Sequence, residues 1–122
     1  MSHYQPVMQT FRSPNDLSTR QFCFVKMGSA NDEVVLCTVA GEIAVGVLMN
    51  NPAAGELAEV ALFGGGTKVK CSGIVARGAP ISVTVTTGQG KAAVATEQVV
   101  ALALETSAAN DIIPVQLLTY KI

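Results

Sequence analysis

The sequence predicts an all-β protein, either a small barrel or a sandwich of about ten short strands, on three observations. Hydrophobic residues make up 49% of the chain, but their excess lies in Ala and Val, and Trp is absent. Small and β-branched side chains favour strands packed closely together over a bundle of helices. Turn signals rich in Gly, Pro, Asn and Asp recur about every 8–12 residues, which is typical of barrels and sandwiches.

The third observation is an internal pseudo-repeat at an offset of 55 residues. The motif Val-Ala-x-Glu-x-x-Val at 39–45 returns at 94–100, and eight positions of the window 37–62 are identical to their counterparts in 92–117. A repeat of this kind indicates one supersecondary unit used twice, with each copy covering the apolar face of the other.

Taken in order, the chain begins with a polar arm at 1–20, which is interrupted by prolines and shows neither helical nor strand periodicity. We expect this arm to be extended and ordered only when docked. A single β domain made of two related halves follows at 21–122. Its strands are expected at 21–27, 34–39, 44–49, 57–63, 68–75, 81–86, 91–95, 99–104 and 112–120.

The clearest strand signal is the alternation of 81–86, which predicts Ile81, Val83 and Val85 on the core face and hydroxyls outside. The segment 50–56 breaks the preceding apolar strand, because its Pro cannot pair and its Gly allows positive φ. Gly64-Gly65-Gly66 predicts another turn, Gly73 a bulge, and Ala108-Ala109 one helical turn.

Charged residues are only 14% of the chain, and the net charge is −1. So little charge suggests that part of the surface is covered by another subunit. The sequence shows no footprint for direct nucleic-acid binding, since the four cations of 60–96 lack interleaved aromatic residues and are explained by solubility. No apolar run resembles a signal peptide or is long enough to cross a membrane.

The three cysteines, Cys23, Cys37 and Cys71, form no Cys-x-x-Cys pair, and the one histidine, His3, cannot complete a zinc site with them. We interpret them as reduced, buried thiols, which indicates assembly in a reducing cytoplasm. No metal or other cofactor is expected.

No motif in the chain predicts catalysis. Gly64 to Lys68 has the wrong spacing for a phosphate-binding loop, and Lys70 lacks the flanking residues of a biotinyl or lipoyl carrier lysine. Glu42 with Glu97, and Glu56 with Asp111, occupy equivalent positions of the repeat, where turns favour acidic residues. A nucleophile would need a base, and the chain has only His3. We therefore expect a non-enzymatic protein.

The arm carries the candidate binding residues. Aromatic and arginine side chains are common interface anchors, and a segment that orders on binding can cover a large area at modest affinity. The hypothesis is a docking strap, against the alternative of an unstructured leader. Its anchors would be Tyr4, Phe11, Arg12, Leu17 and Arg20.

The chain resembles a family of small tailed-phage capsid decoration, or cement, proteins encoded beside the major capsid protein. The resemblance spans about residues 15–118. It is carried by Asp16-Leu17-Ser18, Gln21-Phe22-x-Phe24-Val25-Lys26, Gly46-Val47-Leu48-x-Asn50-x-Pro52-Ala53-Ala54-Gly55-Glu56, the segment 73–78, and Ala103-Leu104-Glu105-x-x-Ala108-Ala109-x-Asp111-Ile112-Ile113-x-Val115-x-Leu117-Leu118. One departure is Val99-Val100-Ala101-Leu102 where family members often have glycine before the ending.

The resemblance implies a protein that binds the major capsid protein on the outside of the phage head, commonly as a homotrimer, and braces the shell. It would be made in the cytoplasm of the bacterial host and end on the capsid exterior. Two alternatives remain: a surface-displayed β module that recognises host glycans or another partner, and a carrier-like domain. The scarcity of aromatic residues argues against the glycan reading.

Overall fold

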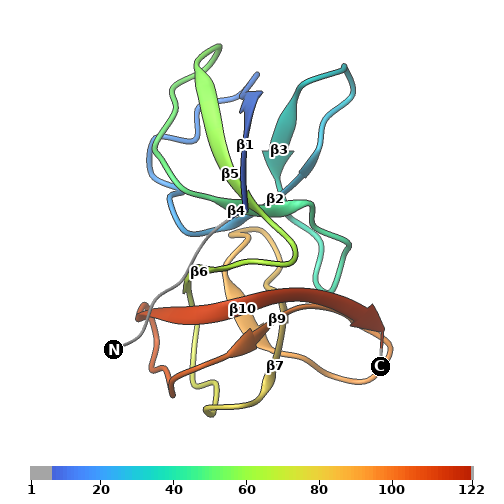
Figure 1. Cartoon of the computed structure of the whole chain (residues 1–122), viewed down its shortest axis with the longest axis vertical. Helices are drawn as coiled ribbons and strands as arrows, with labels where there is room; N and C mark the ends of the chain where they lie inside the picture. The colour runs from blue at the N-terminus through green and yellow to red at the C-terminus, as the bar shows by residue number, and fades with distance from the viewer. Residues whose placement is uncertain (1–6, 122) are drawn as a thin grey trace.

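The computed structural model describes residues 7–121 as two five-stranded antiparallel sheets, with no helix in that part of the chain. In Figure 1 the first sheet lies above the second, and neither closes into a barrel. The prediction of an all-β protein is confirmed, and the arrangement is sandwich-like. The strands are β1 (Val7–Arg12), β2 (Phe24–Met27), β3 (Val34–Leu36), β4 (Gly46–Leu48), β5 (Leu57–Leu62), β6 (Gly66–Lys70), β7 (Pro80–Val83), β8 (Gly90–Ala92), β9 (Gln98–Ala103) and β10 (Ile112–Lys121).

The two sheets have the same topology. The first has the order β1-β5-β4-β2-β3 and the second β6-β10-β9-β7-β8, so adding five to each strand number of the first gives the second. β5 and β10 begin at Leu57 and Ile112, which differ by the offset of 55 found in the sequence. The earlier strands β2 and β7 are offset by 56, because the second half contains one residue fewer between β8 and turn 94–97 than the first half contains between β3 and turn 39–42. The pseudo-repeat is therefore a duplicated five-stranded sheet.

Backbone conformation preserves the duplication where residue identity does not. Of the ten residues with positive φ in the described part of the chain, eight form four equivalent pairs, and each pair contains one glycine and one other residue. The partner residue tolerates a left-handed conformation that glycine adopts more readily. The pairs are Phe22 with Gly78, Asp32 with Gly88, Gly41 with Thr96, and Gly55 with Asn110.

The main core lies between the sheets, where Phe24, Val47 and Ala61 of the first sheet pack in one cluster with Ile81 and Val115 of the second. A smaller cluster lies within the first half and includes Phe11, Leu17, Val25, Leu48 and Val60. Neighbouring residues of one strand, such as Val47 and Leu48, belong to different clusters, so β4 is covered on both faces. This explains its continuous apolar sequence.

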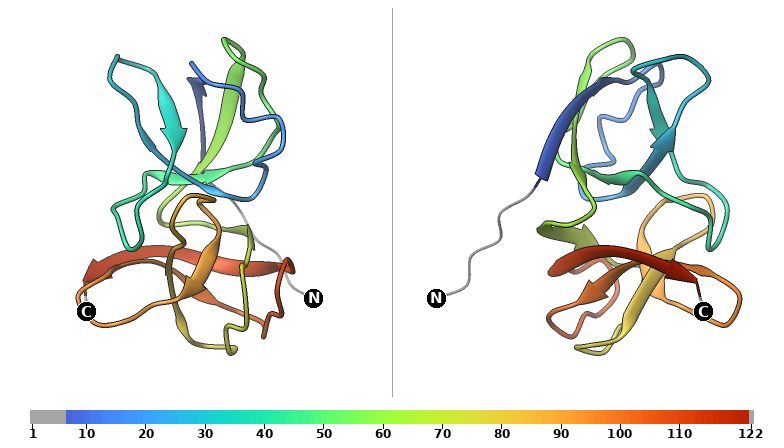
Figure 2. Two further views of the ribbon diagram at one scale, coloured as in Figure 1. Left: turned by 180° about the vertical axis from the view of Figure 1, so that it is seen from behind. Right: turned by 45° about the vertical axis from the view of Figure 1, so that its right-hand side comes forward.

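Loops from each half reach the other half. In Figure 1 the loop between β3 and β4 descends to the second sheet, and the loop between β7 and β8 rises toward the first. Figure 2 shows both loops from two further directions. The Gly41 amide donates to the Val83 carbonyl at 3.0 Å, the Thr86 amide to the Thr38 carbonyl at 2.8 Å, and the Phe24 amide to the Gly88 carbonyl at 2.7 Å.

The structure corrects the predicted boundary between an arm at 1–20 and a domain at 21–122. Val7–Arg12 forms β1, which pairs with the whole of β5 from Val7 opposite Leu62 to Arg12 opposite Leu57. The following segment is bonded to the body, since the Leu17 amide donates to the Pro52 carbonyl at 2.8 Å. Only Phe11 of β1 is buried, so this edge strand shows no alternation in its sequence.

Three local expectations were also wrong. Val85 is exposed and Ser82 is buried, because β7 ends at Val83 and Ser82 donates a hydrogen bond to Glu97. The strand expected at 68–75 ends at Lys70, and beyond it the Val75 amide donates to the Ser107 hydroxyl. Residues 108–111 form a turn rather than a helical turn.

Candidate functional site

The predicted strap residues have different environments. Phe11 and Leu17 are only 7% and 4% exposed and belong to the core of the first half, so they cannot anchor a partner without unfolding β1. Arg12 lies on the surface and pairs with the Glu33 carboxylate at 2.6 Å. Arg20 is half-buried beside the turn that leads into β2, and Tyr4 lies outside the described residues. The structure therefore does not bring the four described residues, Phe11, Arg12, Leu17 and Arg20, together as one docking strip.

Glu42 closes turn 39–42 of the first half. Its Oε2 accepts the backbone amides of Thr38 and Val39 at 2.7 and 2.8 Å, and Lys26 donates to Oε1 at 2.9 Å. Partial burial alone would raise the pKa of Glu42, but the hydrogen bonds from Lys26 and the two amides outweigh it and lower that pKa. The same hydrogen bond raises the pKa of Lys26.

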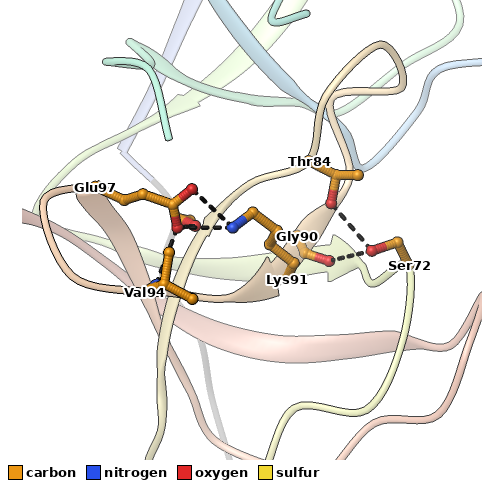
Figure 3. A network of polar contacts seen from close by, with 7 residues as sticks. Ser72, Thr84, Gly90, Lys91, Val94 and Glu97 are labelled. Atoms are coloured by element: carbon orange, nitrogen blue, oxygen red, sulfur yellow. Dashed lines mark hydrogen bonds and ion pairs between the residues drawn. The ribbon is translucent and has the colours of Figure 1, made fainter. Parts of the chain in front are cut away.

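Glu97 has the equivalent role in turn 94–97 of the second half, as Figure 3 shows. Its carboxylate accepts the Val94 amide at 2.9 Å, the Ser82 hydroxyl at 2.9 Å, and two hydrogen bonds from Lys91 at 2.7 and 2.8 Å. Burial opposes ionisation here too, yet the donors prevail and the pKa of Glu97 is lowered. Ser82 occupies the position equivalent to Lys26, so the donor has changed while the acceptor has been kept.

The second carboxylate pair also closes turns. Glu56 accepts the Ala53 amide at 2.7 Å, and Asp111 accepts the Ala108 amide at 2.9 Å. All four repeated carboxylates thus bond to backbone amides three or four residues earlier in the chain. Within residues 7–121 no three His, Cys, Asp or Glu side chains are grouped as they would be to hold a metal ion.

Gly64 and Gly65 lie in the predicted turn, which joins β5 to β6, and Lys70 lies at the end of β6. Gly66 already lies in β6, which pairs with β10, and Lys70 ends that strand opposite Ile112. A carrier lysine would stand at the tip of a hairpin, whereas the Lys70 amide donates to the Phe22 carbonyl of the first half at 2.9 Å. The described residues contain no helix that could span a lipid bilayer.

All three cysteines are buried free thiols. Burial raises the pKa of each, that of Cys37 to about 12. Their positions fit the interpretation of small hydrophobic side chains in the core.

The first half also has an open apolar pocket of about 420 Å³, which sequence reasoning missed. It lies between the end of β2, the segment before β4, and the residue that follows β5. Ile43 is 70% exposed and Met27 is 53% exposed, so large apolar side chains face solvent here. The pocket is lined by Lys26, Met27, Ile43, Ala44, Val45 and Phe63.

These observations define an all-β protein with a duplicated five-stranded sheet and an apolar pocket on one half. Comparisons with models of protein families and with curated proteins find no match. Among solved structures, the chain is similar to the head fiber N base (gp8.5) of bacteriophage phi29, with a TM-score of 0.72 and 14% identity. The similarity covers 93% of this chain and 95% of that one, and at this identity it shows a shared fold.

Proposed function

We propose that this protein is a structural component of a phage virion that binds the major capsid protein on the outside of the head and stabilises the shell. The observation that carries the proposal is the fold shared, over nearly the whole of both chains, with a protein named as the base of a phage head fiber. The resemblance to capsid decoration proteins supports the same proposal, and it is based on sequence motifs rather than on the fold.

The site chemistry agrees with a binding role. The repeated carboxylates are engaged by backbone amides and by Lys26 or Lys91, and the cysteines are buried. Exposed apolar side chains occur in both halves, for example Ile43, Leu57 and Ile74 at 70%, 64% and 78%. A capsid offers the same contact many times, so a modest affinity at each site would reinforce the whole shell through many simultaneous contacts. The protein would act as a homotrimer, as the resemblance implies.

The proposal is tested by co-sedimentation with expanded, empty capsids assembled from the major capsid protein of the phage or prophage that encodes this chain. We expect saturable binding and a higher denaturation temperature of the decorated shell. Wild-type protein that fails to pellet with these capsids at tens of micromolar would overturn the proposal. A glycan array run on the same preparation tests the surface-displayed binding module.

A further inference from the structure

We infer that copies of this chain associate head to tail, with turn 94–97 of one copy docked in the apolar pocket of the next. The inference rests on the self-association in the proposed function and not on capsid binding. It comes from comparing the pocket with its counterpart in the second half. The counterpart in the second half is covered by turn 39–42 of the first half. The equivalent of that turn in the second half is turn 94–97.

The equivalents of the pocket residues are found by adding the repeat offset of 55, or 56 for β2. Met27 corresponds to Val83, Ile43 to Gln98 and Ala44 to Val99. Val83 is fully buried and Gln98 is half-buried, whereas Met27 and Ile43 are 53% and 70% exposed. Ala44 and Val99 are both buried. The same structural position is therefore closed in the second half and open in the first.

Turn 39–42 of the first half closes the position in the second. The Gly41 amide donates to the Val83 carbonyl at 3.0 Å, and the Gln98 amide donates to the Gly41 carbonyl at 3.1 Å. A Cβ on Gly41 would lie 2.5 Å from Cγ of Glu97, so the turn sits directly on that side chain. Two reciprocal backbone hydrogen bonds fix the turn like a short added strand.

The equivalent turn of the second half, 94–97, has the same construction, but within residues 7–121 the amide and carbonyl of Thr96 make no backbone hydrogen bond like those of Gly41. It has the same hydrogen bond across the turn, at 3.2 Å against 3.3 Å for 39–42, and positive φ at Thr96 as at Gly41. Val94 is 58% exposed, close to the 57% of Val39, and its neighbours Ala95 and Thr96 are exposed. The apolar pocket of the first half is therefore an open site of the kind that turn 39–42 covers in the second half, and turn 94–97 has the same shape as turn 39–42.

A second copy of the chain supplies both missing parts. Its Thr96 amide and carbonyl would face the Met27 carbonyl and the Ile43 amide of the first copy, as Gly41 faces Val83 and Gln98 within the chain. Thr96 has a side chain where Gly41 has none, so the docked turn would stand farther from Glu42 than turn 39–42 stands from Glu97. The open pocket beside Met27 and Ile43 leaves space for that shift. The contact is heterologous, so repetition builds a ring or a longer array.

Charge favours the same pairing. Residues 7–62 hold three cations and six carboxylates, and residues 63–121 hold five cations and three carboxylates. The acidic first half of one copy would meet the basic second half of the next, which promotes encounter and orients the partners.

The test uses two exposed positions, Ile43 and Ala95, where a substitution is expected to leave the fold intact. Ile43→Glu blocks the pocket, Ala95→Glu blocks the turn, and Ile74→Glu is the matched control, since Ile74 is 78% exposed and belongs to neither surface. Circular dichroism checks that all variants fold. By sedimentation velocity from 1 to about 500 µM, we expect wild type and Ile74→Glu to associate and each blocking variant to weaken association at least tenfold.

Mixing the two blocked variants distinguishes head-to-tail association from a symmetric contact. Ile43→Glu retains its turn and Ala95→Glu retains its pocket, so the mixture should form heterodimers and no larger species. The inference is overturned if wild type stays at 12.6 kDa over this range, if a blocking variant associates like the control, or if the mixture stays monomeric. None of these measurements involves a capsid, so failure here is distinguishable from failure of capsid binding.

Discussion

Replacing Gly41 with alanine should destabilise the junction between the two sheets far more than the same change at Gly55. Both residues have positive φ, +70° and +85°. A Cβ at Gly55 meets nothing within 4 Å, whereas at Gly41 it would lie 2.5, 2.8 and 2.9 Å from Cγ, Cβ and Cδ of Glu97. Gly55→Ala therefore isolates the backbone cost, and Gly41→Ala adds the steric one.

The magnitude follows from what Glu97 would lose. A left-handed alanine costs about 1–2 kcal/mol at either position. Glu97 cannot swing aside freely, because its carboxylate accepts four hydrogen bonds, from Ser82, Lys91 and Val94. Disrupting this group of mostly part-buried bonds costs about 1–3 kcal/mol more. Gly41→Ala should thus lose about 2–5 kcal/mol in all.

Urea unfolding followed by circular dichroism measures the difference. With a slope of about 2 kcal/mol/M, the midpoint of Gly41→Ala should lie roughly 0.5–1.5 M below that of Gly55→Ala. In the Glu97→Ala background the penalty of Gly41→Ala should shrink, since Cγ and Cδ of residue 97 are gone. Equal midpoints for the two glycine variants would refute the reasoning.

Three further predictions follow from the same contacts. The pKa values of Glu42 and Glu97 are lowered in the folded protein. The two carboxylates therefore stabilise the fold above the ordinary pKa of 4.5, and this stabilisation is lost as pH falls below that value. A Glu42→Gln/Glu97→Gln variant should show a flatter loss of thermal stability between pH 5 and 3 than wild type. A double variant with the wild-type slope would contradict this assignment. Phe11→Ala should lose about 3 kcal/mol in urea unfolding because Phe11 is 7% exposed, and deletion of residues 2–18, which removes β1, should unfold the protein. A folded 2–18 deletion would show that β1 is dispensable. The three buried thiols, with the pKa of Cys37 raised to about 12, should react with a thiol reagent at pH 8 only in denaturant, and labelling of the native protein within minutes would count against their burial.

Sequence patterns anticipated the duplicated β architecture because the repeat survives at its turn carboxylates. Glu42 and Glu97 are identical, and Glu56 and Asp111 keep their charge, since each must accept backbone amides in a turn of fixed shape. The early part of each repeat unit, which contains β2 or β7, was harder to detect in the sequence. Its two copies are offset by 56 residues rather than 55, and glycine in one copy is replaced by another residue at the equivalent positive-φ position of the other, as at Phe22 and Gly78.

The role of the N-terminal segment could not be predicted from local pattern. β1 is an edge strand with one buried residue, and Leu17 packs from an irregular loop, so neither periodicity appears. The pocket left one trace, which is Ile43 at a position where the second copy of the repeat has Gln98. That contrast becomes meaningful only when the structure shows Gln98 beside a docked turn and Ile43 exposed.

The loops exchanged between the sheets make the stability of each half depend on the other half. Turn 39–42 closes the core position at Val83, and Gly88 accepts the amide at the start of β2. Neither half is complete without a segment donated by its neighbour, although each has the full set of five strands. The two sheets therefore form a single cooperative unit rather than two independently folding domains. Its melting should be one calorimetric transition, with the van't Hoff and calorimetric enthalpies equal.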